Sequence, residues 1–253
     1  MINATNQLLL ITDLDNTLVG DDLATKKLNQ YLCTYRQNHV LVYATGRSYA
    51  SAQQLRQERQ LLEPNYWVTG VGTEIYSQAT LDLNWANKID TGWERDAFAA
   101  LVNKHFPEFK PQIATEHNLW KLSFHLNETN NSISKLQIDK LANNLQKMKL
   151  NAQVVFSSNV DVDILPVNAN KGKAIKYIQT ELGIANHKTL VCGDSGNDIS
   201  MFQQQTFGVI VNNAQSELIE WYKANADERH YFANNSYANG ILEALQKFDF
   251  LFQ

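Results

Sequence analysis

The chain has 253 residues, of which 44% are hydrophobic and 19% are charged, and its formal net charge is −4. This length and composition allow a substantial buried core and are typical of a globular enzyme. The net negative charge and the lack of a dense Lys/Arg block exclude a basic surface for nucleic acid. No apolar run approaches the 18 residues of a membrane span. The N-terminus also lacks a signal-peptide pattern, so we expect a cytoplasmic protein without a membrane partner.

Strand and helix patterns alternate in the first third of the chain. Apolar runs at residues 8–12, 40–43 and 66–69 predict strands, and helical patterns lie at 22–35 and 48–61. Strands separated by helices of this length indicate a parallel sheet with right-handed crossovers. We therefore predict an α/β fold with a Rossmann-like parallel-sheet core.

The same alternation returns in the last third of the chain. The predicted helices there are 171–182, 197–204, 216–225 and 240–248, and the predicted strands are 189–192 and 208–211. The two α/β portions would then form one core, built from residues 1–81 and 166–253.

The stretch between them, residues 82–165, has a different pattern. It predicts a helix at 93–105, a strand at 121–126, a helix at 132–149 and strands at 153–157 and 160–165. A unit of this composition and size favours a small antiparallel sheet. We predict an inserted, smaller α+β domain that acts as a cap.

Two aspartates follow the first predicted strand, in the segment Asp13-Leu14-Asp15-Asn16-Thr17. Carboxylates two residues apart at a turn can project toward one point, where they repel each other unless a cation lies between them. A hard cation that prefers oxygen ligands, such as Mg2+, meets this requirement. Mg2+ beside a carboxylate nucleophile indicates phosphoryl transfer through an aspartyl-phosphate. The alternative is a strand-end turn with solvated aspartates.

Three further motifs lie at the ends of predicted strands or open a predicted helix. The segment Ala44-Thr45-Gly46-Arg47 offers a hydroxyl and backbone N–H groups to a phosphate oxygen. Lys171 opens a helix and can stabilise phosphoryl charge. The segment 193–198 places Asp194 and Asp198 where they could complete the oxygen shell of a cation. Each motif alone could be a helix cap, a turn or a solvated side chain, but open α/β sheets gather such motifs at one edge.

The ordered set of motifs resembles a known superfamily. Asp13, Asp15, Thr45, Lys171, Asp194 and Asp198 resemble the four motifs of the haloacid-dehalogenase superfamily, and the inserted domain resembles its type C2 cap. Within it, the chain is similar along nearly its whole length to the sucrose-phosphate phosphatases of cyanobacteria and plants. The segments that carry this closer resemblance are 13–17, 43–49, 72–76, 120–123, 161–166 and 193–198.

This resemblance implies a Mg2+-dependent phosphatase that hydrolyses sucrose 6-phosphate to sucrose and phosphate. Asp13 would be the nucleophile and Asp15 the acid and base. Thr45 and Lys171 would hold phosphoryl oxygens. The implied metal ligands are Asp13, Asp15 through its backbone carbonyl, Asp194 and Asp198. The implied substrate-binding residues are Thr45, Gly46, Arg47, Glu74, Trp120, Lys121, Asp161, Asp163 and Asn197.

Several alternatives remain open at this stage. We expect a monomer whose partner is a small-molecule sugar phosphate, with sucrose-phosphate synthase as a further partner. A phosphatase for another sugar phosphate, such as glucosylglycerol phosphate or mannosylglycerate phosphate, fits the same motifs, and so does a non-catalytic module that binds sugar phosphates. Trp120 could instead be a core tryptophan of the cap.

Overall fold

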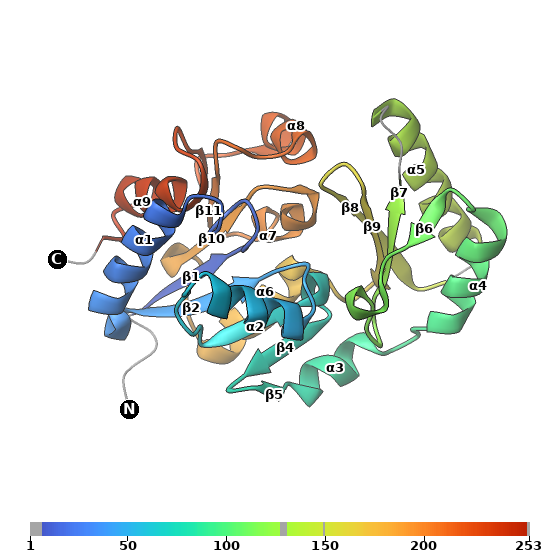
Figure 1. Ribbon diagram of the computed structural model, residues 1–253, viewed down its shortest axis with the longest axis horizontal. Helices are drawn as coiled ribbons and strands as arrows, with labels where there is room; N and C mark the ends of the chain where they lie inside the picture. The colour runs from blue at the N-terminus through green and yellow to red at the C-terminus, as the bar shows by residue number, and fades with distance from the viewer. Residues whose placement is uncertain (1–6, 127–130, 149, 252–253) are drawn as a thin grey trace.

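The computed structural model describes residues 7–126, 131–148 and 150–251, which form two sheets (Figure 1). In the larger sheet the strand order is β12-β11-β10-β1-β2-β3-β4-β5. These strands are β1 (Leu8–Thr12), β2 (His39–Ala44), β3 (Tyr66–Thr69), β4 (Glu74–Ser77), β5 (Thr80–Leu81), β10 (Thr189–Gly193), β11 (Phe207–Ile210) and β12 (His230–Phe232). Neighbours from β12 to β3 are parallel, whereas β4 and β5 form an antiparallel edge. The α/β fold class with a Rossmann-like core is confirmed.

Helices cover both faces of this sheet because successive strand residues point to opposite sides. Leu8 and Leu10 of β1 belong to an apolar cluster with α1 (Asp22–Thr34), α2 (Tyr49–Glu58) and α9 (Tyr237–Lys247). Leu9 and Ile11 belong to the cluster on the other face, with α3 (Leu83–Ile89), α6 (Lys171–Leu182), α7 (Ile199–Phe202) and α8 (Ser216–Asn225). Burial on both faces explains why these strands read as uninterrupted apolar runs.

The smaller sheet is antiparallel and lies beside the larger one, on the right in Figure 1. Its strands, in the order β6-β7-β9-β8, are β6 (Phe109–Pro111), β7 (Leu122–Leu126), β9 (Asp161–Pro166) and β8 (Ala152–Ser157). Its own apolar cluster includes Phe98 of α4 (Arg95–His105) and Leu141 of α5 (Asn131–Lys147). This is the smaller α+β unit predicted from the sequence, and we call it the cap.

The junction between the two parts differs in detail from the expectation. The helix α3 begins directly after residue 82, yet its Trp85, Ala86 and Ile89 pack in the cluster of the larger sheet. The domain boundaries at residues 82 and 165 therefore stay a prediction. Among the described residues, no helix is long and apolar enough to cross a membrane.

Several short elements were not predicted, namely α3, β4, β5, β6 and β12. The four strands have two to four residues each, too few for a periodic pattern to stand out. The helix predicted at 197–204 is a 3-10 turn over Gly196–Asp198 followed by the single turn of α7. The helix predicted at 132–149 ends at Lys147, and residue 149 lies outside the described residues.

Strand register places the motifs side by side at one edge of the larger sheet. Thr12, the last residue of β1, pairs with Tyr43 of β2 and with Cys192 of β10. The N–H of Asp13 then donates to the carbonyl of Cys192 over 3.0 Å. The residues that follow these three strands therefore meet at their carboxyl ends, where α/β sheets bind ligands.

Close packing under this edge makes Gly172 a sensitive position. A Cβ there would lie 1.9 Å from the backbone oxygen of Ser200. We predict that Gly172→Ala lowers the free energy of unfolding by about 2 kcal/mol or more, despite the preference of helices for alanine. Gly183→Ala is the control, because it meets no atom within 4 Å and costs only its positive φ of 65°, about 1 kcal/mol. Urea unfolding measures both, and equal losses would contradict the packing argument.

Candidate active site

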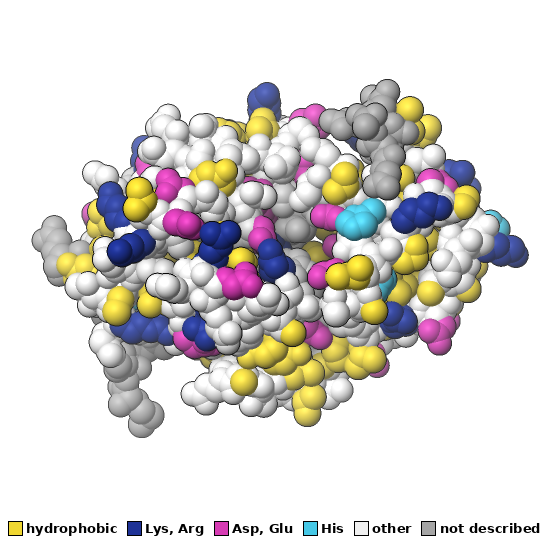
Figure 2. Space-filling view, viewed as in Figure 1, with side chains coloured by type: hydrophobic (Ala, Val, Ile, Leu, Met, Phe, Trp, Pro, Cys, Tyr) yellow, Lys and Arg dark blue, Asp and Glu magenta, His cyan; other side chains and the backbone are white. Residues whose placement is uncertain are grey.

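A cavity of about 340 Å3 lies between the carboxyl edge of the larger sheet and the cap. Figure 2 shows acidic and basic side chains gathered where the surface is hollowed between the two halves of the molecule. The cavity is lined by Asp13, Asp15, Asn16, Thr45, Gly46, Arg47, Gln112, Glu116, Lys121, Ser157, Ser158, Asp161, Asp163, Asp194, Ser195 and Asn197. Ten of these are site residues predicted from the sequence.

An acidic cluster with a buried lysine forms the core side of the cavity. Carboxylate oxygens of Asp13, Asp194 and Asp198 lie within 4.8 Å of one another, and all three residues are buried. The ammonium of Lys171, which has no exposed surface, donates to Asp13 Oδ1 and to Asp198 Oδ1, both over 2.7 Å. Thr17 Oγ1 donates to Asp194 Oδ1 over 3.0 Å. Residues from both ends of the chain thus build one charged cluster.

Asp198 shapes the loop that carries Asp194. Its Oδ2 accepts from the backbone N–H groups of Asp194 over 2.9 Å and of Ser195 over 3.1 Å, and Ser195 caps the turn in return. Its Oδ1 is held by Lys171. Asp198 therefore orients the backbone of Asp194 and Ser195 and the side chain of Lys171. The role of Asp198 as a metal ligand stays a prediction.

The single ammonium of Lys171 does not neutralise the three carboxylates of the acidic cluster. Burial raises the pKa of Asp13 to about 7, although Lys171 pulls it down. Burial, followed by the charges of Asp13 and Asp198, raises the pKa of Asp194 to about 9. Burial alone would lower the pKa of Lys171, but the two carboxylates beside it raise that pKa, so the ammonium stays charged.

These groups fit a divalent cation. Three carboxylates with one ammonium leave excess negative charge in a buried place, and oxygen ligands suit hard cations. The cluster can hold such an ion at Asp13 and Asp194. The side chain of Asp15, predicted to contribute through its carbonyl, is not part of this cluster.

Hydrogen bonds hold the backbone of the loop after β2 at Thr45 and at Arg47. The N–H of Thr45 donates to the carbonyl of Val68 over 2.8 Å, and the N–H of Arg47 donates to Thr45 Oγ1 over 3.2 Å. Ser48 then caps α2 by accepting from the N–H of Ser51. We call Thr45–Arg47 the phosphate loop, after the phosphate contact predicted for it from the sequence.

Arg47 and Asp15 form a bidentate ion pair at the cavity wall. Arg47 Nε donates to Asp15 Oδ2 and Arg47 Nη2 to Asp15 Oδ1, each over 2.7 Å. The third nitrogen, Nη1, donates to Ser51 Oγ over 2.9 Å. The fork holds the Asp15 carboxylate in one orientation beside Asp13.

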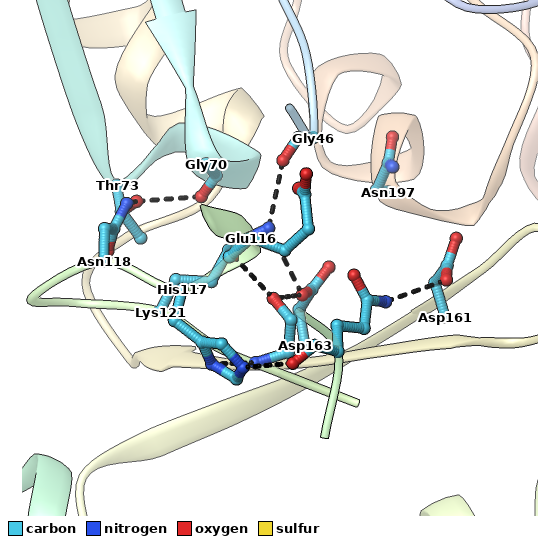
Figure 3. Close-up of polar contacts among 12 residues, drawn as sticks. Gly46, Gly70, Thr73, Glu116, His117, Asn118, Lys121, Asp161, Asp163 and Asn197 are labelled. Atoms are coloured by element: carbon cyan, nitrogen blue, oxygen red, sulfur yellow. Dashed lines mark hydrogen bonds and ion pairs between the residues drawn. The ribbon is translucent and has the colours of Figure 1, made fainter. Parts of the chain in front are cut away.

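The cap side of the cavity is polar. Asp163, which is 5% exposed, accepts from Ser123 Oγ over 2.6 Å and lies 3.6 Å from Lys121 Nζ. Gln112 Nε2 donates over 2.9 Å to Oδ1 of Asp161, which Figure 3 labels. Carboxylates, an amide and an ammonium facing one cavity can hydrogen-bond several hydroxyl groups of one ligand.

Two of these cap residues, Gln112 and Glu116, were missed in the sequence. Gln112 directly follows β6, and Glu116 ends a 3-10 turn before β7. Both lie in an irregular connection without periodicity. Only the pairing of β6 with β7, which the sequence does not reveal, brings this connection to the cavity.

Two predicted binding residues lie elsewhere, since neither lines the cavity. Trp120 is 9% exposed, packs in the apolar cluster of the larger sheet, and donates from its indole nitrogen to Asp90 Oδ1 over 2.7 Å. Glu74 accepts from Thr69 Oγ1 over 2.9 Å, and burial raises its pKa. The structure thus places Trp120 at the base of the cap as a packing residue.

A parallel sheet whose carboxyl edge carries this acidic cluster and lysine, beneath an inserted α+β cap, defines a haloacid-dehalogenase-like fold. A haloacid dehalogenase-like hydrolase from Bacillus subtilis shares it, with a TM-score of 0.64 at 18% identity over 95% of this chain and 91% of that one. The model of the sucrose-6F-phosphate phosphohydrolase family matches residues 6–249. The chain belongs to this family.

Individual relatives agree with this assignment. Sucrose-phosphatase 2 of Nicotiana tabacum is 34% identical over 94% of this chain. This chain spans 58–60% of the length of such plant relatives. Mannosylfructose-phosphate phosphatase of Agrobacterium fabrum is 32% identical, over 94% of this chain and 95% of the relative. The sucrose-phosphatase of Synechocystis, solved with sucrose and phosphate, has a TM-score of 0.91 and 48% identity over 96% of this chain and 98% of that one.

The raised pKa values of Asp13 and Asp194 predict how the free energy of unfolding varies with pH. Without a cation, folded Asp13 and Asp194 keep their protons up to about pH 7 and 9, whereas unfolded aspartates release them near pH 3.8. Folding therefore takes up protons between these values, and the free energy of unfolding should fall as the pH rises from about 4 to about 9. Urea unfolding in chelator at several pH values measures this fall.

A saturating divalent cation should reduce the fall, because the cation replaces the protons. Asp194→Asn should flatten the alkaline part of the profile in chelator, because the amide has no proton to lose. A stability that rises with pH in chelator would contradict the raised pKa values.

Proposed function

We propose that this chain hydrolyses sucrose 6-phosphate to sucrose and phosphate through an aspartyl-phosphate on Asp13. The observation that carries the proposal is that one cavity joins a phosphoryl-transfer cluster on the core to a wall of hydroxyl-binding groups on the cap. Family membership and the Synechocystis relative, which holds sucrose and phosphate together, support the choice of sugar.

Asp13 and Asp15 would divide the chemistry. An Asp13 oxygen forms a bond to phosphorus while the bond from phosphorus to the sugar oxygen breaks, and Asp15 gives that oxygen a proton. Asp15 then takes a proton from water as the water oxygen attacks phosphorus and releases Asp13. Asp15 lines the cavity beside Asp13, which supports this division, and its carboxyl would leave the ion pair with Arg47 to carry the proton.

The remaining groups would stabilise charge on the phosphoryl oxygens. Lys171 orients Asp13, and the Thr45 hydroxyl with the N–H of Gly46 would bind the phosphoryl group. Asp13 and Asp194, with Asp198 behind them, would hold the metal. We infer that this metal is Mg2+, because all ligands offered are oxygens, and when bound it neutralises phosphoryl charge.

The cap would select the sugar. We infer that Gln112, Glu116, Lys121, Asp161 and Asp163 hydrogen-bond the hydroxyl groups. A site built for hydroxyls rejects analogues that lack them more strongly than an apolar pocket discriminates by size. Asn197 lies opposite this wall, where its Nδ2 is 3.4 Å from Ser157 Oγ of the cap. Trp120 and Glu74 would support the cap from outside the cavity.

A second candidate substrate is mannosylfructose phosphate. The Agrobacterium phosphatase named for it is nearly as similar to this chain as the plant sucrose-phosphatases are, and this chain covers almost all of it.

Four expectations from the sequence remain proposals. Residues 82–165 would form the cap domain. The protein would be a monomer in the cytoplasm, and sucrose-phosphate synthase would be its protein partner.

Phosphate release should require both Asp13 and Mg2+. Asp13→Asn keeps the size of the side chain but removes the nucleophile, so we predict that kcat falls by several orders of magnitude. A continuous assay of phosphate released from sucrose 6-phosphate measures this, with chelator and added Mg2+ as the second comparison. Near-normal turnover of the variant, or turnover in chelator, would refute the proposed mechanism.

Glu116→Ala should separate sugar recognition from phosphorus chemistry. We predict that kcat/KM for sucrose 6-phosphate falls at least tenfold while kcat/KM for p-nitrophenyl phosphate changes less than twofold, because that ester has no sugar hydroxyls. Trp120→Phe is the control, since it removes the bond to Asp90 without touching the cavity, and it should affect both esters alike. Equal losses from Glu116→Ala on both esters would contradict a sugar role for this wall.

A further inference from the structure

Three successive carbonyl groups of the phosphate loop each accept a hydrogen bond. The carbonyl of Thr45 accepts from the N–H of Val71 over 3.1 Å, and that of Arg47 from the N–H of Gly70 over 2.9 Å. The carbonyl between them, that of Gly46, accepts from Lys121 Nζ of the cap over 3.0 Å (Figure 3). Two supports of the loop therefore come from one turn of the core, and the third comes from the cap.

That core turn, Gly70–Gly72, has an unusual backbone. Its three residues have φ values of 56°, 59° and 95°. The middle residue, Val71, is fully buried and β-branched, a type of side chain that rarely takes a positive φ. Such a conformation costs about 1–3 kcal/mol and persists only where its surroundings impose it. Contacts on several sides must therefore fix this turn.

The same turn also supports the start of α6. A Cβ at Gly72 would lie 2.2 Å from the carbonyl carbon of Asn170 and 2.5 Å from the nitrogen of Lys171. Gly72 is thus in direct contact with the backbone of the lysine that holds Asp13. A shift of the turn would move the phosphate loop and Lys171 together.

One side chain ties this turn to the cap. Thr73, which has no exposed surface, donates from Oγ1 to the carbonyl of Gly70 over 2.8 Å and accepts from Asn118 Nδ2 over 2.9 Å (Figure 3). Asn118 also bridges to Lys121 through the backbone, and its Oδ1 accepts from the N–H of Trp120. The short cap segment 118–121 therefore reaches the core at Thr73 and at Gly46 at once.

We propose that Thr73 is a positioning residue that couples sugar bound at the cap to phosphate bound at the core. A sugar that holds the cap wall in place also holds Asn118 and Lys121 against the turn and the phosphate loop. Phosphate bound in that loop favours the same arrangement, so each ligand tightens the binding of the other. Thr73 does not line the cavity, so it would act without contact to either ligand. The inference rests on the proposed function for the identity of the sugar.

The coupling can be measured with sucrose and inorganic phosphate as separate ligands. Calorimetry in Mg2+ gives the phosphate affinity of the wild-type protein with and without saturating sucrose. We expect sucrose to tighten phosphate binding about fivefold or more, in the usual range for coupled sites. In Thr73→Val the factor should fall to less than half of the wild-type value, because the variant loses both hydrogen bonds of the Thr73 hydroxyl while the contact of Lys121 with Gly46 remains.

Three further variants make the result specific. Thr73→Ser keeps the hydroxyl and should keep the coupling. Asp90→Ala removes the bond from Trp120, elsewhere along the same junction, and should also keep it. Asn118→Ala removes the bond to Thr73 from the cap side and serves if Thr73→Val does not fold.

The outcomes separate the inference from the proposed function. Full coupling in Thr73→Val, or equal loss in Asp90→Ala, would overturn the inference. A wild-type protein that binds both ligands without coupling would overturn it as well and leave the proposed function intact. A wild-type protein that binds phosphate but no sucrose would overturn the proposed substrate, and the inference with it.

Discussion

The buried ammonium of Lys171 is the interaction on which the rest of the site depends. It joins Asp13, which follows β1, to Asp198, which orients the loop after β10. Removing one partner of such a buried pair typically costs about 3–5 kcal/mol, because charge is left without compensation. One lysine still cannot balance three carboxylates, so the site stays short of positive charge. This deficit suits a divalent cation, and in the proposed function a dianionic phosphoryl group would bind only with that cation in place.

The second constraint is the way two separately packed units share one cavity. The larger sheet has its own apolar clusters on both faces, and the cap has another. In the proposed function, chemistry at phosphorus would therefore stay constant while the cap wall changes to suit a different sugar. The similarity of this chain to relatives named for sucrose phosphate and for mannosylfructose phosphate agrees with this division.

Much of the core could be predicted from the sequence, because its signals are local. A buried parallel strand followed by Asp13, Thr45 or Asp194 is visible as an apolar run with polar residues at its end, and the sheet edge brings such ends together. The cap side could not be predicted in the same way. Gln112 and Glu116 reach the cavity only through the pairing of β6 with β7, and β6 has three residues.

Trp120 was visible in the sequence as a candidate residue, but its role could not be predicted. An aromatic residue in a cap fits a sugar platform or a packing site equally well, and only tertiary contacts decide between them. The left-handed turn at Gly70–Gly72 was equally hidden, since nothing in the sequence marks Val71 for a positive φ.

The most direct test of this account is a competition assay in which sucrose 6-phosphate, mannosylfructose phosphate, fructose 6-phosphate and glucose 6-phosphate are offered together with Mg2+. We expect sucrose 6-phosphate to be consumed first, with kcat/KM at least about 100-fold above either monosaccharide phosphate, because the proposed site hydrogen-bonds hydroxyls on both sugar rings. Equal consumption of the monosaccharide phosphates, or preference for mannosylfructose phosphate, would contradict it.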